Sequence, residues 1–154
     1  MSILQRRRAL MSAPNDEKNA IIPGNYTNGS STYSVDADHL IHLNGTFNAR
    51  ESNGIKLPFK EALSIQNGDT VRIKIIKVSG SLNGANVTSA KIGSNTVIQN
   101  KSVSTGATFI DNTHTATATY SGDYFVFWRS NDPSYTFTNY VARLEIYING
   151  KQEI

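Results

Sequence analysis

The sequence contains no cysteine and no long apolar run, and these absences exclude several kinds of site and segment. Without cysteine, the chain can form no disulfide framework, thiolate metal site or cysteine nucleophile. Nowhere do about eighteen apolar residues follow one another, so we predict no membrane-spanning helix. The apolar stretch near the N-terminus stops at Ser12 and Pro14, and we therefore expect no signal peptide.

The chain also has only a small excess of positive over negative charge. The formal net charge is +3 over 154 residues, and Arg6, Arg7 and Arg8 supply three of the positive charges. The rest of the chain is nearly neutral, which argues against a surface that follows the phosphates of nucleic acid. We expect no nucleic-acid partner.

No arrangement typical of an active site is present. The 12 acidic residues are scattered over expected turns and outward strand faces, whereas glycosidases need two carboxylates that flank one cleft. A Gly-x-Ser-x-Gly elbow and a glycine-rich loop that opens a helix are both missing. We predict a protein that is not an enzyme and that has no cofactor.

The 3 histidines offer little for metal binding. His39 and His42 are separated by an odd spacing, so on a regular strand they project from opposite faces. Asp36, Asp38 and His42 share one face, which leaves a surface metal as one interpretation and a solvated strand edge as the other. We favour the solvated edge and predict no metal site.

What the chain does contain is apolar residues in a period of two. Val71, Ile73 and Ile75 alternate with Arg72 and Lys74, the pattern of a strand with one buried face. Similar runs predict strands at 40–49, 69–78, 122–129 and 140–148. Weaker candidates lie at 32–36, 55–65, 86–92, 95–99, 106–110 and 113–120.

Asn-Gly dipeptides punctuate most of these runs, as in antiparallel hairpins. Asn44-Gly45 lies inside the first run, so that run is either one strand or a hairpin. Residues 59–64 have a weak helical pattern. The overall prediction is an all-β fold, an antiparallel β-sandwich of jelly-roll type. We expect an N-terminal arm and linker over residues 1–31, the arm helical or extended, and the sandwich over 32–154, with the folded body beginning near Ile21 or Tyr33.

A loop after the aromatic strand is the most plausible binding site in the sequence. Sugar-binding proteins place aromatic rings against the apolar side of a pyranose and polar groups near its hydroxyls. The segment from 128 to 140 contains both kinds of side chain. The predicted glycan-binding residues are Trp128, Asn131, Asp132, Tyr135 and Tyr140. The alternative is that Trp128 and Tyr140 fill the core together with Phe137.

The N-terminal arm combines basic and apolar side chains, which favours docking onto a protein over a solvated tail. The predicted anchoring residues are Ile3, Leu4, Arg6, Arg7, Arg8, Leu10 and Met11. The segment from Met1 to Met11, placed before a β-rich body, resembles the N-termini of tail-associated and other accessory virion proteins of phages and prophages. The body resembles, at the level of fold, the carbohydrate-binding-module and jelly-roll domains that such proteins carry.

This resemblance implies a virion accessory protein that assembles in the host cytoplasm. The arm would bind other virion proteins, and the sandwich, as part of a homo-oligomer, would contribute to attachment to the host surface through a glycan. The alternative is a purely structural protein, a head or capsid decoration or a tail cement, that binds no receptor. The resemblance leaves head and tail locations equally open.

Overall fold

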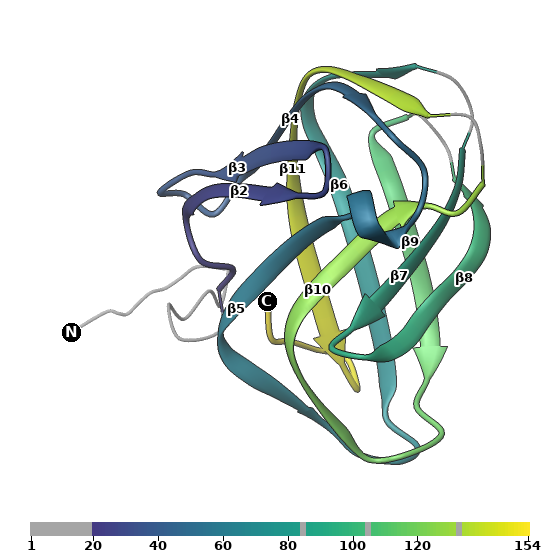
Figure 1. The fold of residues 1–154 in the computed structure, drawn as a ribbon. Helices are drawn as coiled ribbons and strands as arrows, with labels where there is room; N and C mark the ends of the chain where they lie inside the picture. Colours follow the sequence, from purple (N-terminus) through teal and green to yellow (C-terminus); the bar gives the residue numbers. More distant parts are fainter. Residues whose placement is uncertain (1–19, 84–85, 104–105, 132–133) are drawn as a thin grey trace.

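The computed structural model describes residues 20–83, 86–103, 106–131 and 134–154. These residues form antiparallel strands and one short 3₁₀ helix, η2 (Glu51–Asn53) (Figure 1). The strands are β2 (Gly24–Asn28), β3 (Ser31–Val35), β4 (Ile41–Phe47), β5 (Ile55–Ile65), β6 (Thr70–Asn83), β7 (Asn86–Ile92), β8 (Asn95–Val103), β9 (Thr108–Thr115), β10 (Tyr120–Arg129), β11 (Tyr135–Ile148) and β12 (Lys151–Gln152). The part of the chain that the structure describes holds no helix long and apolar enough to cross a membrane.

The strands form two sheets that pack face to face. One has four strands in the order β5-β10-β7-β8, and the other has seven, ordered β2-β3-β4-β11-β6-β9 with β12 beside β11. Strands β4 to β11 divide between the two sheets, four in each, and of these only β7 and β8 follow one another within one sheet, which is the order of a jelly roll. The β2–β3 hairpin extends the larger sheet beyond β4 (Figure 1). The predicted fold class is confirmed.

Aromatic side chains from both sheets meet in the core. Phe109 of β9 packs edge-on against Phe127 of β10 at 6.0 Å between ring centroids, and against Phe137 of β11 at 6.3 Å. Tyr140 lies 4.8 Å from Phe137. Each such ring removes a large apolar area from water, and edge-on pairs add about 0.5–1.5 kcal/mol beyond that burial. The cluster therefore holds the two sheets together.

The folded body begins earlier than the predicted boundary between residues 31 and 32. Residues 20–22 lie along the outer edge of β5: Ile22 N–H donates to the Pro58 carbonyl at 2.9 Å, and Lys60 N–H donates to the Ala20 carbonyl at 3.0 Å. Ile21 is buried, and the next residues form β2. The folded body therefore begins near Ile21, the earlier of the two predicted starting points, and residues 20–31 are not a linker.

Most strand predictions are confirmed, those at 55–65 and 86–92 to the residue. The candidates at 106–110 and 113–120 both overlap one strand, β9 (Thr108–Thr115), whereas residues 116–119 are not in a strand and Tyr120 begins β10. Residues 59–64 belong to β5 and are not helical. Asn44-Gly45 is no turn, because β4 continues through it and Gly45 pairs with Phe137. The predicted arm at residues 1–13, with all its anchoring residues, lies outside the described residues.

Candidate aromatic binding face

Strand β10 places two aromatic rings on the outer face of the four-stranded sheet. Because side chains alternate along a strand, Phe125 and Phe127 enter the core while Tyr124, Val126 and Trp128 lie on the opposite side of the sheet, where Val126 is itself buried, at 2% exposure, against Gly54. Tyr124 and Trp128 are both half-buried. Four residues of strand separate them by about 13 Å. We call this surface, with the lysines described next, the aromatic face.

Two lysines flank Val126 from the neighbouring strands. Lys56 of β5 and Lys91 of β7 are both its register partners. The Lys56 ammonium lies 4.2 Å from the centroid of the Tyr124 ring, and the Lys91 ammonium lies 5.8 Å from that of Trp128. Such cation–π contacts are worth about 0.5–1 kcal/mol at exposed positions, so they orient the side chains without fixing them.

One carboxylate completes the charge pattern of the face. Glu51, in η2, accepts a hydrogen bond from Lys91 through Oε1 at 3.0 Å. Lys56 has no carboxylate within ion-pair distance among the described residues. Two ammonium groups therefore face one carboxylate, and the local balance is positive.

An open hollow of about 360 Å³ lies beside Tyr124. Its lining combines an aromatic ring with amide, hydroxyl, ammonium and carboxylate groups: Asn28, Glu51, Ser52, Lys56, Tyr124 and Val126. Asn28 fixes this wall, because its side-chain amide donates to the Gly54 carbonyl at 2.9 Å and ties β2 to the residues after η2. An exposed ring beside polar groups is the arrangement that binds a sugar ring.

The structure does not bring the predicted glycan-binding residues together in one site. Tyr135 and Tyr140 expose only 2% and 1% of their surface and belong to the core, so their assignment to a glycan site is wrong. Trp128 points outward and Asn131 is exposed. Asp132 lies outside the described residues.

The signal that excludes Tyr140 was already in the sequence. In the predicted strand at 140–148, Tyr140 is an even number of residues from Ala142 and Leu144, so it shares one face with these apolar residues. Tyr124 was missed because the site was sought in the loop after β10 and not on the strand itself. Lys56 and Lys91 come from strands whose position beside β10 is not encoded in any local pattern.

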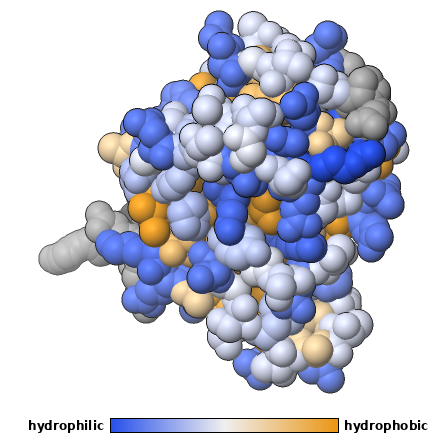
Figure 2. All heavy atoms as spheres, in the orientation of Figure 1, coloured by the Kyte–Doolittle hydropathy of each residue, from blue (hydrophilic) through white to orange (hydrophobic). Residues whose placement is uncertain are grey.

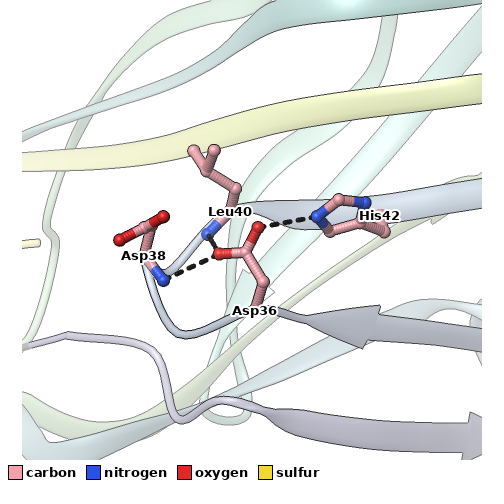
Figure 3. Close-up of polar contacts among 4 residues, drawn as sticks. All are labelled: Asp36, Asp38, Leu40 and His42. Carbon is pink, nitrogen blue, oxygen red and sulfur yellow. Dashed lines mark hydrogen bonds and ion pairs between the residues drawn. The ribbon is translucent and has the colours of Figure 1, made fainter.

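Asp36 and His42 form a hydrogen-bonded pair (Figure 3). Oδ2 of Asp36 lies 2.7 Å from Nε2 of His42, while Oδ1 accepts the backbone N–H groups of Asp38 and Leu40 at 2.8 and 3.0 Å. The bond from His42, aided by these N–H groups, lowers the pKa of Asp36. No group of three or more potential ligands for a metal occurs in the described ranges.

Comparison with known proteins adds no relative. No family profile, no curated protein and no solved structure matches the chain. The aromatic face must therefore be interpreted from its own chemistry.

Proposed function

We propose that this protein is a non-catalytic virion accessory protein of a phage or prophage, which contributes to attachment to the host surface through a glycan. The observation that carries the attachment role is the pair of outward rings, Tyr124 and Trp128, together with the hollow lined by polar groups beside Tyr124. Jelly rolls occur in viral capsid and lectin domains, which is compatible with this role, although a fold alone does not define function.

The aromatic face suits an extended polymer because its two rings, Tyr124 and Trp128, lie on one strand and on the same side of the sheet. A separation of about 13 Å lets two rings contact different units of one chain. Each contact is weak, and strong attachment then requires many copies. In this proposal the arm, through residues 1–14, fixes several copies to other virion proteins and the sandwiches project from the particle.

A purely structural decoration or cement protein remains the alternative proposal. Permanent interfaces are rich in apolar side chains. Among the described residues, the large hydrophobic side chains that are exposed are Ile22, at 39%, and Val78, at 50%. Figure 2 shows hydrophilic residues over most of the visible face, with hydrophobic ones in small groups between them. This surface favours reversible contact with a polar ligand.

A glycan array that includes bacterial surface polysaccharides tests the attachment role. We expect the full chain to bind, and Trp128→Ala or Tyr124→Ala to weaken binding about tenfold. Tyr147→Ala, on the seven-stranded sheet, is the matched control and should bind as the wild type does. Binding that survives both substitutions on the aromatic face, or no binding at all, would reject the glycan contact.

Substitution of Arg6, Arg7 and Arg8 by alanine in the full chain tests the anchoring role. Incorporation into phage particles should fall while binding to the array is retained. Unchanged incorporation would show that the arm is not the anchor. Loss of particle stability with normal adsorption to the host, after deletion of the gene, would favour the structural alternative.

A further inference from the structure

A second hollow lies on the seven-stranded sheet, away from the aromatic face. Its volume is about 560 Å³, and its lining residues come from β2, β3, β4 and β11, which are neighbours in this sheet (Figure 1). The polar side chains that line it are exposed or partly exposed and carry mainly hydroxyl and amide groups: Asn25, Thr27, Thr32, Ser34, His42, Asn44 and Asn139. The partly exposed Tyr26 and Val141 also line it. We call it the polar hollow.

A double irregularity in the sheet places Asn139 in the polar hollow. The register of β11 shifts between Phe137 and Tyr140 against β4, and between Thr138 and Val141 against β6. Asn139 adopts a φ of 46°, a left-handed conformation that is uncommon for a residue with a side chain. A bulge of this kind re-aims a side chain and is over-represented next to functional sites.

The neighbouring strand β6 has a glycine where the bulge approaches it. Gly80 of β6 has a φ of 85°, and a Cβ at this position would lie 2.1 Å from the carbonyl oxygen of Asn139. Only glycine permits so close an approach of the two backbones. Asn139 and Gly80, both with a positive φ, therefore maintain the bulge in β11 together. Residues held in strained backbone conformations cluster at ligand-binding sites.

Further hydrogen bonds fix two neighbouring side chains. Oδ1 of Asn44 accepts the backbone N–H of Asn139 at 2.8 Å, which leaves the Asn44 amide nitrogen without a protein partner among the described residues. Asp36 holds the ring of His42 at the edge of the hollow (Figure 3). Side chains held in this way lose little entropy when a ligand binds.

We infer that the polar hollow binds an uncharged saccharide. Amide and hydroxyl groups both donate and accept hydrogen bonds, as sugar hydroxyls do. Its lining contains no lysine, arginine or carboxylate, and its imidazole, His42, is paired with Asp36. An acidic polymer would find no ammonium or guanidinium group in this lining, and an apolar ligand would leave the amides unpartnered. This inference does not depend on the aromatic face.

Titration of the ¹⁵N-labelled full chain with maltohexaose, cellohexaose and chitohexaose, followed by NMR, tests the inference. With at least one of these probes, the backbone amides of β4 and β11 around Asn44 and Asn139 should shift. Asn139→Gly keeps the left-handed backbone and removes the amide, and it should weaken binding about tenfold. Thr113→Ala, on the outer face of β9, is the control and should bind normally. Trp128→Ala should leave these shifts unchanged, which separates this site from the proposed function.

Three results would overturn the inference. The first is the absence of shifts around the hollow with all three neutral probes. The second is that sialyllactose or oligogalacturonate shifts these amides and the neutral probes do not. The third is that Asn139→Gly, folded as judged by its NMR spectrum, binds as the wild type does.

Discussion

The hydroxyl of Tyr33 bonds to both backbone groups of Lys56. It donates to the Lys56 carbonyl at 2.9 Å and accepts the Lys56 N–H at 2.8 Å. Lys56 lies on β5, at the edge of the four-stranded sheet, and Tyr33 lies on β3 of the other sheet. The hydroxyl thus replaces a partner strand at this point of an edge that would otherwise be open.

Tyr33→Phe should therefore destabilise the fold by about 1–3 kcal/mol, because two hydrogen bonds are lost and one backbone donor and one acceptor lose their partner. Urea unfolding followed by circular dichroism measures this. Tyr147→Phe removes a hydroxyl that bonds to the Glu145 side chain at the surface, and it should cost less than about 1 kcal/mol. Equal effects of the two substitutions would show that the edge contact has no special role.

Tyr140→Phe should stabilise the fold, in contrast to Tyr33→Phe. The Tyr140 hydroxyl is buried without a hydrogen-bond partner among the described residues, and burial raises its pKa to about 12. Removal of this hydroxyl should stabilise the fold by about 1 kcal/mol. A destabilised variant would reveal a partner for the hydroxyl.

The raised pKa of Tyr140 also predicts a dependence on alkaline pH. Above about pH 10 the unfolded chain loses the Tyr140 proton while the folded chain retains it, so stability must fall as the pH rises. Tyr140→Phe should lose less stability than the wild type between pH 9 and 11. Parallel curves for the two proteins would contradict this.

Gly80→Ala should be among the most damaging substitutions of a surface residue. The added Cβ meets the Asn139 carbonyl oxygen, and the φ of 85° is strained for alanine, so we expect a loss of at least about 3 kcal/mol. Gly68→Ala has a similar φ of 90° but no atom within 4 Å of the new Cβ, and it should cost about 1–2 kcal/mol. Thermal unfolding compares the two, and a similar loss for both would show that the contact at Gly80 relaxes easily.

The lowered pKa values of two surface carboxylates, Asp36 and Asp111, predict that the fold loses stability in acid. His42 lowers the pKa of Asp36, and Arg72, with two hydrogen bonds of 2.8 and 2.7 Å, lowers that of Asp111. A carboxylate with a lowered pKa stabilises the fold above its unfolded value near 3.8, and this stabilisation is lost as the pH falls through the folded pKa. Between pH 2 and 6, Asp111→Asn and Arg72→Gln should therefore show a shallower decline of Tm than the wild type. If Tm declines with falling pH as steeply in both variants as in the wild type, the Asp111–Arg72 pair does not cause the loss of stability in acid.

The sequence predicted the jelly roll because its strands alternate regularly. Val71, Ile73 and Ile75 identify the buried face of β6 without reference to any other strand. Strand β2 was missed because most of its residues are exposed, so no alternation marks it. Pairing with β3 alone makes it a strand.

The sites were harder to predict because they depend on which strands become neighbours. Trp128 was identified by its type, but Lys56 and Lys91 are brought beside it by the sheet order. The bulge at Asn139 depends on Gly80, 59 positions earlier along the chain, and no local signal links the two. Tyr135 and Tyr140 show the converse: residue type suggested a ligand contact, and packing placed both in the core.

The most direct test of the attachment role is the fluorescence of Trp128, the only tryptophan in the sequence. Its emission reports on the aromatic face alone, so no substitution is needed. Titration of the full chain with polysaccharides purified from bacterial surfaces should produce a saturable change in emission for each polymer whose binding on the array is weakened by Tyr124→Ala. If such a polymer binds and leaves the emission of Trp128 unchanged, this result contradicts the assignment of the aromatic face as the attachment site.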